Sequence, residues 1–185
     1  MKQMEQIMNS SISINEVIIY QGEMHHNFKK VKDKYPSLKH LWTTNWNNPF
    51  FLRFMVPLLL RSSIIYNIDD DVYMGKNTLK SMKNVVEEDD AVTAFYGRRI
   101  TKLVYHPSTF HQLGINQGRN KTVVDFLVVS YCLKLEYAKV FWRYRGMMVR
   151  NGEDIHLSMT NHLECDRKSI IPPIMSDSEP TVLRD

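Results

Sequence analysis

Three consecutive carboxylates, Asp69, Asp70 and Asp71, are the side chains of this sequence best suited to chemistry. They come directly after the apolar run from Ile64 to Ile68, which is typical of a buried strand. Adjacent like charges repel one another and are costly to desolvate, so a divalent cation is the expected counter-charge. Carboxylates suit Mg²⁺ or Mn²⁺, which keep coordination positions for water and substrate phosphates. The pattern predicts a metal site that receives a diphosphate-bearing substrate at a strand end.

A solvated turn that caps the next helix is the alternative for these acids, because Asp is favoured in turns and at early helical positions. The residues that follow argue against it. Tyr73, Met74 and Gly75 intervene, and the next helix is expected only from Asn77. The acids therefore stand several residues before any helix cap and belong to the strand end.

A second acidic pair, Glu153 and Asp154, follows Gly152 at the start of a helix that we expect to run to about Cys165. Adjacent helical residues point in different directions, so one carboxylate can face a site while the other caps or orients. Acids in a first helical turn also suit the helix dipole, so a plain capping pair is the alternative.

Alternating helices and strands must position these acids. The order predicts an α/β fold with a largely parallel or mixed sheet flanked by helices. A chain of 185 residues with 43% hydrophobic residues is expected to form one domain, over residues 1–175, with a polar, loose tail over 176–185. The expected helices cover 2–10, 28–35, 50–60, 77–86, 135–143 and 153–165, and the expected strands cover 16–21, 38–42, 62–68, 90–96, 103–106, 122–129 and 169–171.

The composition narrows the function classes. A net charge of +4 is mildly basic, and the basic clusters are interleaved with acids, so we expect an anionic small substrate and no nucleic acid. Cys132 and Cys165 lack metal-ligand spacing and are interpreted as buried or incidental thiols. No secretory signal is evident, and the longest apolar run, Phe54–Leu60, is too short to span a membrane. We expect a soluble chain, cytoplasmic or of unassigned location, with its oligomeric state left open.

Taken together, the acidic segments resemble a known family. Tyr66–Asp71 resembles the Asp-x-Asp signature of nucleotide-sugar-dependent glycosyltransferases with the GT-A fold. Val124–Val128, Phe141–Trp142 and Asn151–Ser158 are similar to the acceptor-side segment of a GT-A subgroup that includes glycosyltransferases of large algal DNA viruses. The order and spacing match from about residue 3 to residue 174.

This resemblance implies a mixed, mostly parallel GT-A sheet and a metal-dependent hexosyl- or deoxyhexosyltransferase. The enzyme would use Mn²⁺ or Mg²⁺ and move a sugar from a nucleoside diphosphate sugar to a glycan or protein-glycan acceptor. Family members usually begin with a strand that cradles the nucleotide base. This chain begins at the following helix, so we expect that first strand to be absent. The family often has a Gly-His type turn where this chain has Val129–Cys132, so substrate contacts there are not carried over.

The resemblance also assigns roles to single residues. Asp71 would bind the metal directly, Asp69 would face the ribose or a metal-bound water, and Asp70 would assist either. For an inverting reaction Asp154 is favoured as the base that activates the acceptor hydroxyl, with Glu153 beside it.

Other candidates come from residue type. Arg53, one charge in an apolar segment, is expected to reach the sugar or diphosphate, because guanidinium groups pair with phosphate oxygens. The alternative is that Arg53 extends to water. His156 or His162 would add an imidazole ligand, although such a histidine is more often structural. Trp46 and Tyr131 would stack on a sugar, with core packing as the alternative.

Two rival functions are kept. One is a catalytically inactive GT-A remnant that acts as a binding module for sugar or a partner protein. The other is Mg²⁺-dependent phosphoryl transfer of the aspartyl-phosphate type, which also starts from a strand ending in Asp-x-Asp and needs a nearby lysine. Phosphoryl transfer gives the Glu153–Asp154 pair no role.

Overall fold

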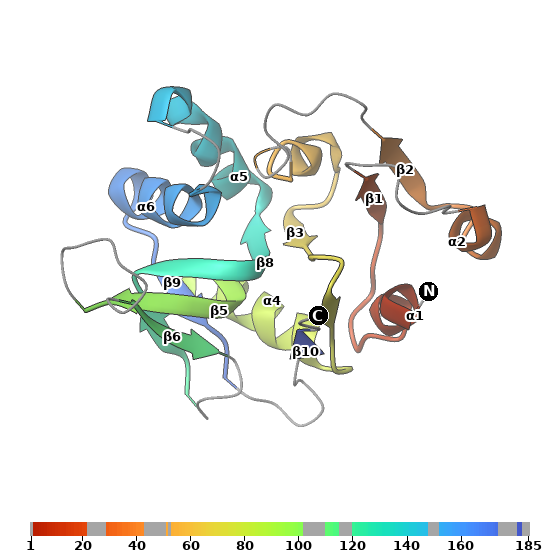
Figure 1. Cartoon of the computed structure of the whole chain (residues 1–185), viewed down its shortest axis with the longest axis horizontal. Helices are drawn as coiled ribbons and strands as arrows, with labels where there is room; N and C mark the ends of the chain where they lie inside the picture. The colour runs from red at the N-terminus through yellow and green to blue at the C-terminus, as the bar shows by residue number, and fades with distance from the viewer. Residues whose placement is uncertain are drawn as a thin grey trace.

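The computed structural model describes residues 2–21, 29–42, 51, 53–101, 110–114, 120–147, 152–173 and 181–182. Its largest sheet has six strands in the order β3-β8-β5-β9-β7, with β6 paired to β5 (Figure 1). The strands of this sheet are β3 (Ile64–Asn67), β5 (Val92–Ile100), β6 (Phe110–Gly114), β7 (Thr122–Val124), β8 (Phe126–Lys134) and β9 (Ser169–Ile171).

Two further pairs of strands stand apart from this sheet in the described part of the chain. β1 (Ile18–Gln21) pairs in parallel with β2 (Lys39–Trp42), on the same side of the molecule as α1 (Lys2–Met8) (Figure 1). β4 (Val72–Tyr73), which follows the three acids, pairs antiparallel with β10 (Thr181–Val182). Two residues of the expected polar tail therefore pair with the chain just beyond the acids.

Helices cover both faces of the six-stranded sheet. α5 (Leu135–Phe141) and α6 (Glu153–Cys165) contact β8 on one face, and α4 (Thr78–Asp89) contacts β5 and β8 on the other (Figure 1). Leu133 of β8 belongs to the apolar cluster under α5 and α6, and its neighbour Cys132 to the cluster under α4, as strand alternation requires. The other helices are α1 (Lys2–Met8), α2 (Lys29–Lys34) and the 3-10 helices η1 (Val56–Leu59) and η4 (Trp142–Met147).

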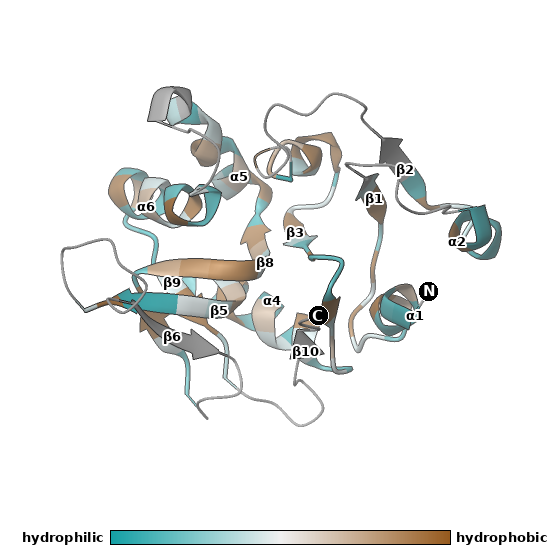
Figure 2. Cartoon of the chain, viewed as in Figure 1, coloured by the Kyte–Doolittle hydropathy of each residue, from teal (hydrophilic) through white to brown (hydrophobic). Residues whose placement is uncertain are grey.

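The sequence of β8 explains its central place. Seven of its nine residues are buried, which is the pattern of a strand covered on both faces. α4 instead buries one stripe, with Leu79, Met82 and Val86 among its buried residues, and presents its other side to water. Figure 2 shows β8 as a mainly hydrophobic strand and the segment after β3 as hydrophilic.

The α/β class and the mixed sheet flanked by helices are confirmed, but the prediction that the sheet is mostly parallel is wrong. β8 runs antiparallel to β3 and β5, β6 to β5, and β7 to β9, and only β5 and β9 are parallel in this sheet. Parallel neighbours need a crossover, usually a helix. No helix separates β5 from β8 in the described residues, so these strands return beside one another in opposite directions.

The strand expected over 90–96 does not end before Gly97, since β5 continues to Ile100. A Cβ atom at Gly97 would lie 2.6 Å from Cγ2 of Val124 and 3.1 Å from the carbonyl oxygen of Phe126. Glycine is therefore required here for close approach of the neighbouring chain. The predicted strand over 103–106 lies outside the described residues.

Two other predicted elements differ in extent. The strand expected over 122–129 is divided at Asp125, whose carboxylate accepts a hydrogen bond from the Ile100 amide at 2.6 Å, and β8 then continues to Lys134. The helix expected over 50–60 has turns at residues 53–55 and then η1, which has Pro57 in its first turn, where a missing N–H costs nothing. None of the described helices is long and apolar enough to cross a membrane.

Candidate functional site

Asp69 lies just beyond the end of β3 and is held by two partners. Its Oδ1 accepts a hydrogen bond from Nη1 of Arg53 at 2.9 Å, and its Oδ2 accepts one from the Ser130 amide at 3.2 Å. The Asp69 amide in turn donates to Oγ of Ser130 at 2.9 Å. Burial raises the pKa of Asp69, and the charge of Arg53 acts in the opposite direction. The carboxylate is therefore fixed in direction before any ligand arrives.

Asp70 and Asp71 form an exposed turn between β3 and β4. The turn is anchored by Gln3 of α1, whose amide donates to the carbonyl oxygens of Asp69 at 2.5 Å and of Val72 at 2.9 Å. The described residues hold no group of three or more His, Cys, Asp or Glu side chains placed to bind a metal together. The exposed carboxylates are hard oxygen donors, so the turn fits a cation held by one or two carboxylates and completed by water and phosphate oxygens.

Asp154 lies in the first turn of α6 and is directed toward Tyr131 of β8. Its Oδ1 accepts a hydrogen bond from the hydroxyl of Tyr131, a fully buried residue of β8. Burial, together with the negative charges of Glu153 and Asp69, raises the pKa of Asp154 to about 6, although Tyr131 and Arg53 act in the opposite direction. A carboxylate with this pKa exchanges its proton near neutral pH, as a general base must.

Glu153, the neighbour of Asp154, bonds the backbone at the start of α6. Its Oε2 accepts a hydrogen bond from the Gly152 amide at 3.1 Å, and Gly152 has a φ of 106°, which favours glycine. The helix start is tied to β8 through Ser158, whose Oγ accepts from the Leu127 amide and donates to the Asp154 carbonyl, both at 3.0 Å. The structure thus places one acid in a capping position and the other toward Tyr131.

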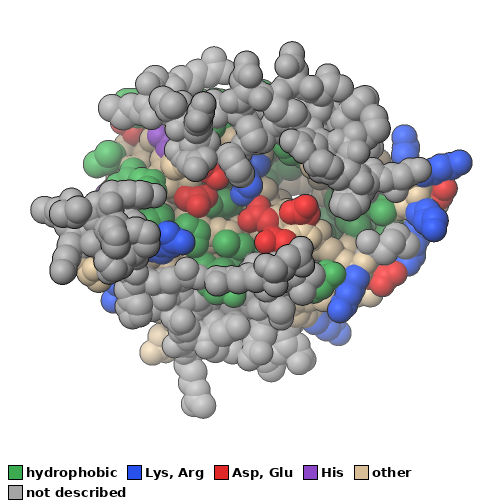
Figure 3. Space-filling model, viewed as in Figure 1, with side chains coloured by type: hydrophobic (Ala, Val, Ile, Leu, Met, Phe, Trp, Pro, Cys, Tyr) green, Lys and Arg blue, Asp and Glu red, His purple; other side chains and the backbone are tan. Residues whose placement is uncertain are grey.

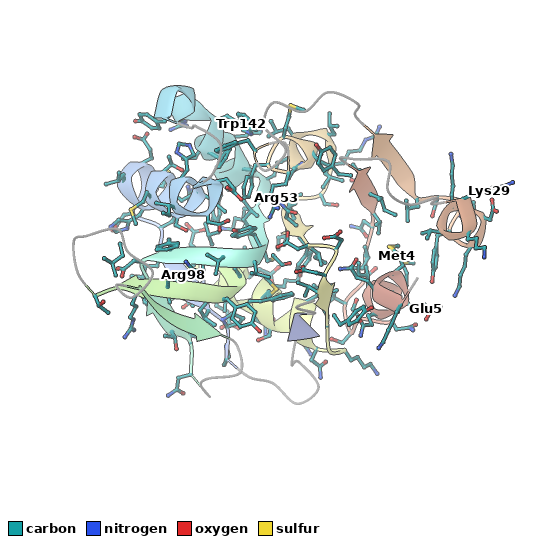
Figure 4. All side chains as sticks on the ribbon, in the orientation of Figure 1. Met4, Glu5, Lys29, Arg53, Arg98 and Trp142 are labelled. Atoms are coloured by element: carbon teal, nitrogen blue, oxygen red, sulfur yellow. The ribbon has the colours of Figure 1, made fainter. Side chains whose placement is uncertain are left out.

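Arg53 joins the two acidic groups. Burial lowers the pKa of its guanidinium, but Asp69, Tyr131, Glu153 and Asp154 together outweigh burial and raise it. Figure 4 places Arg53 beside β3 and β8, and Figure 3 shows acidic side chains gathered around basic ones in the middle of this face. Asp69, through an ion pair, and Asp154, through its charge, therefore both interact with the half-buried Arg53 although they are distant in sequence.

The weaker sequence candidates have structural roles or lie elsewhere. Tyr131 is fully buried and packs 5.4 Å from the ring of Phe54, so it does not offer a face to a sugar. Nε2 of His156 lies 2.8 Å from the Phe141 carbonyl oxygen. His162 is exposed and lies near Asp166. Trp46 is outside the described residues.

Sequence reasoning missed Ser130 and the true part played by Tyr131. Both lie inside an almost wholly apolar segment, Phe126–Leu133, in which a hydroxyl is unexpected. Two hydroxyl groups in an apolar strand could have indicated a polar contact, because a buried hydroxyl normally needs a hydrogen-bond partner. The partner itself could not be read from the sequence.

Neither a family model nor a curated protein sequence matches this chain. Solved structures do match. GalNAc-T7 with UDP, GalNAc and Mn²⁺ aligns with a TM-score of 0.71 at 10% identity, over 98% of this chain and 40% of that one. TarS of S. aureus aligns with a TM-score of 0.62 at 14% identity, over 94% of this chain and 34% of that one. Apo UDP-glucose pyrophosphorylase aligns with a TM-score of 0.53 at 9% identity, over 95% of this chain and 78% of that one.

These likenesses show the fold. The chain shares the GT-A-like, mixed α/β fold of these proteins, and the predicted α/β class is confirmed. The chain spans 40% and 34% of the lengths of the first two neighbours. The similarity to viral glycosyltransferases stays a prediction.

Proposed function

We propose that this chain is a metal-dependent glycosyltransferase domain that moves a hexosyl or deoxyhexosyl group from a nucleoside diphosphate sugar to a glycan or protein-glycan acceptor. The observation that carries the proposal is the pairing of two acids around Arg53. Asp69 is fixed at a strand end by an ion pair, and Asp154 has a pKa of about 6. The GT-A-like fold supports it, since one solved neighbour holds UDP, GalNAc and Mn²⁺.

On the donor side, Asp71 is the proposed direct ligand of Mn²⁺ or Mg²⁺, with Asp70 assisting. The bound cation would act as a Lewis acid that neutralises charge on the departing diphosphate. Both oxygens of Asp69 already accept hydrogen bonds, so we assign Asp69 to the ribose or a metal-bound water rather than to the cation itself. Arg53 adds positive charge where the leaving diphosphate becomes more negative.

On the acceptor side, Asp154 is the proposed base of an inverting transfer. The acceptor hydroxyl gives its proton to the Asp154 carboxylate while its oxygen forms a bond to the anomeric carbon. The bond from that carbon to the diphosphate oxygen breaks, and the diphosphate leaves with the electron pair. Oδ1 of Asp154 is held by Tyr131, so Oδ2 would receive the proton. Glu153 keeps the helix start in place.

The rival reaction, phosphoryl transfer through an aspartyl phosphate, needs a nucleophilic carboxylate free to attack and a lysine beside it. Asp69 is instead engaged by Arg53 and Ser130, and no lysine hydrogen-bonds to it among the described residues. These contacts argue against that reaction. A catalytically inactive binding module has the same geometry as an enzyme, so only a measurement of turnover separates the two.

Thermal unfolding with Mn²⁺ and UDP, GDP, CDP or TDP tests the donor site, because a ligand that binds only the folded state raises the melting temperature. We expect a metal-dependent increase with one nucleotide. The Asp71→Ala variant should lose this increase, and the matched Asp70→Ala variant should keep most of it. No increase with any nucleotide, from a folded sample, would contradict the proposed donor site.

A further inference from the structure

Val129 and Ser130 in the middle of β8 have an unusual backbone. Their φ angles are 60° and 54°, in the left-handed region, although neither residue is glycine. A β-branched residue in this region is a genuine outlier, and such outliers persist where the surrounding structure holds them. The pairing of β8 with β5 also passes from Tyr131–Ala94 to Val128–Tyr96, which leaves one extra residue on β8. Together these observations define a β-bulge at Val129–Ser130.

The bulge changes which way the side chains of β8 point. In a regular strand, residues two apart share a face. Leu127 and Tyr131 belong to the apolar cluster under α5 and α6, but Val129 between them packs against the cluster that contains Phe95 and Cys132. Val129 therefore departs from the alternation of β8, while Leu127 and Tyr131 on either side of it keep to one face.

The bulge lets the adjacent residues Ser130 and Tyr131 contact the two acids Asp69 and Asp154. Ser130 exchanges two hydrogen bonds with Asp69, and Tyr131 donates one to Asp154. Neighbouring residues of a regular strand point to opposite faces, so an unbulged β8 would present only one of them to the two acids. Both acids also act on Arg53.

We propose that the Val129–Ser130 bulge is a positioning element, which fixes the donor-side Asp69 relative to the acceptor-side Asp154. This inference rests on the proposed glycosyl transfer and adds two residues to it. Ser130 and Val129 act through Asp69 and Tyr131 and do not touch the substrate. Their role is to keep the diphosphate side and the base at a constant separation, across which the anomeric carbon must fit.

The test removes the Ser130 hydroxyl in two variants, one of which also relaxes the backbone. Ser130→Ala removes Oγ and keeps the amide, whereas Ser130→Gly also relieves the positive φ. Ser81→Ala is the matched control, because Ser81 is equally buried and its Oγ donates to the Pro173 carbonyl at 2.9 Å, away from the acids. All three are compared with the wild type by calorimetric titration of UDP, GDP, CDP and TDP in the presence of Mn²⁺.

Both Ser130 variants should weaken nucleotide binding by about 10-fold, because they loosen Asp69, which is assigned to the ribose or a metal-bound water, and residues that support such a site commonly contribute about this much. Ser81→Ala should bind as the wild type does, even where it unfolds at a lower temperature. Wild-type affinity in both Ser130 variants would overturn the positioning role and leave the proposed function standing. A wild type that binds no nucleotide would overturn the proposed function, and the positioning role with it.

A second measurement needs no nucleotide. Ser130→Ala removes the acceptor of the Asp69 amide, and Asp69→Asn alters the carboxylate that accepts from the Ser130 amide, so the two variants break different hydrogen bonds between the same two residues. In urea unfolding their effects should not be additive, because loss of one bond weakens the other; we expect the unfolding equilibrium constant of the double variant to differ about fivefold from the product of the single effects. Additive effects would show that the two bonds act independently and would overturn the inference.

Discussion

Two aspartates in this molecule each accept a hydrogen bond from a tyrosine, but their pKa values shift in opposite directions. Asp154 accepts a hydrogen bond from Tyr131, and Arg53 supplies positive charge nearby. Asp90 accepts hydrogen bonds from Tyr137 and from Lys134. Hydrogen bonds from Lys134 and Tyr137 hold the pKa of Asp90 below its usual range, whereas burial raises the pKa of Asp154 to about 6.

The surroundings account for the difference. The Asp90 side chain is 58% exposed, so water solvates its charge and the hydrogen bonds dominate. Asp154 is half-buried, and burial together with the negative charges of Glu153 and Asp69 disfavours its ionised form. A tyrosine hydrogen bond and a nearby cation therefore accompany a lowered pKa at Asp90 and a raised pKa at Asp154. Burial and acidic neighbours account for the difference.

The largest expected effect comes from removing the carboxylate with the raised pKa. Asp154→Asn should lower metal-dependent release of nucleoside diphosphate from a nucleotide sugar by about 10²–10⁴-fold, the usual contribution of a general base. The variant should be at least as stable as the wild type at pH 7, because a neutral amide avoids the desolvation that raises the Asp154 pKa. Asp90→Asn is the control and should retain turnover. Equal losses in both variants would remove the distinction between the two pairs.

The second effect concerns the exposed acids. Asp71→Ala should lower the same release by at least about 10-fold through loss of the cation, since even residues that only support metal ligands contribute this much. Asp70→Ala should lower the rate of release by a smaller factor. Added Mn²⁺ at high concentration should partly restore Asp71→Ala, and a loss that Mn²⁺ leaves unchanged would count against Asp71 as the ligand.

The third effect separates the two tyrosines. Tyr131→Phe keeps the buried ring but removes a hydrogen bond that lowers the pKa of Asp154, so the acidic limb of the pH–rate profile should move upward by about one pH unit. Tyr137→Phe removes the corresponding hydrogen bond to Asp90 and should leave that limb in place. A limb that stays at the same pH in Tyr131→Phe would mean that another group titrates.

The smallest effect is on stability. Because the pKa of Asp90 is lowered in the folded chain, its ionised form stabilises the fold above the pKa of the unfolded chain, and this stabilisation is lost as the pH falls through the folded value. Asp90→Asn should lower the free energy of unfolding by less than about 1 kcal/mol at neutral pH, since the pair is exposed. Asn also tolerates the left-handed backbone at this position. Urea unfolding of this variant should match the wild type at strongly acidic pH, and a difference that persists there would show that charge is not the cause.

The sequence located the acids but not their contacts. An apolar run followed by Asp69–Asp71, and Gly152 followed by two acids, are local signals, and both elements form where these signals place them. The direction of β8 depends on long-range pairing with β3 and β5, which local periodicity does not encode.

The bulge at Val129–Ser130 could not be predicted from the sequence for a similar reason. Positive φ angles are normally signalled by Gly, Asn or Asp, and Val129 and Ser130 are none of these. Their conformation is imposed by tertiary contacts, chiefly the exchange of hydrogen bonds with Asp69 and the packing of Val129 against the Phe95 cluster. Local propensity fails here at a place where function is proposed, as is common at strained sites.

The most direct test of the account is the pH dependence of nucleoside diphosphate release by the wild type, measured with Mn²⁺ and the nucleotide sugar whose nucleotide binds. Asp154 must be ionised to accept a proton, so the rate should rise with pH through a limb near its pKa of about 6. Metal-dependent release with that limb is the predicted result. No release from a chain that binds the nucleotide, or a rate that is flat across this range, would contradict Asp154 as the base of a glycosyl transfer.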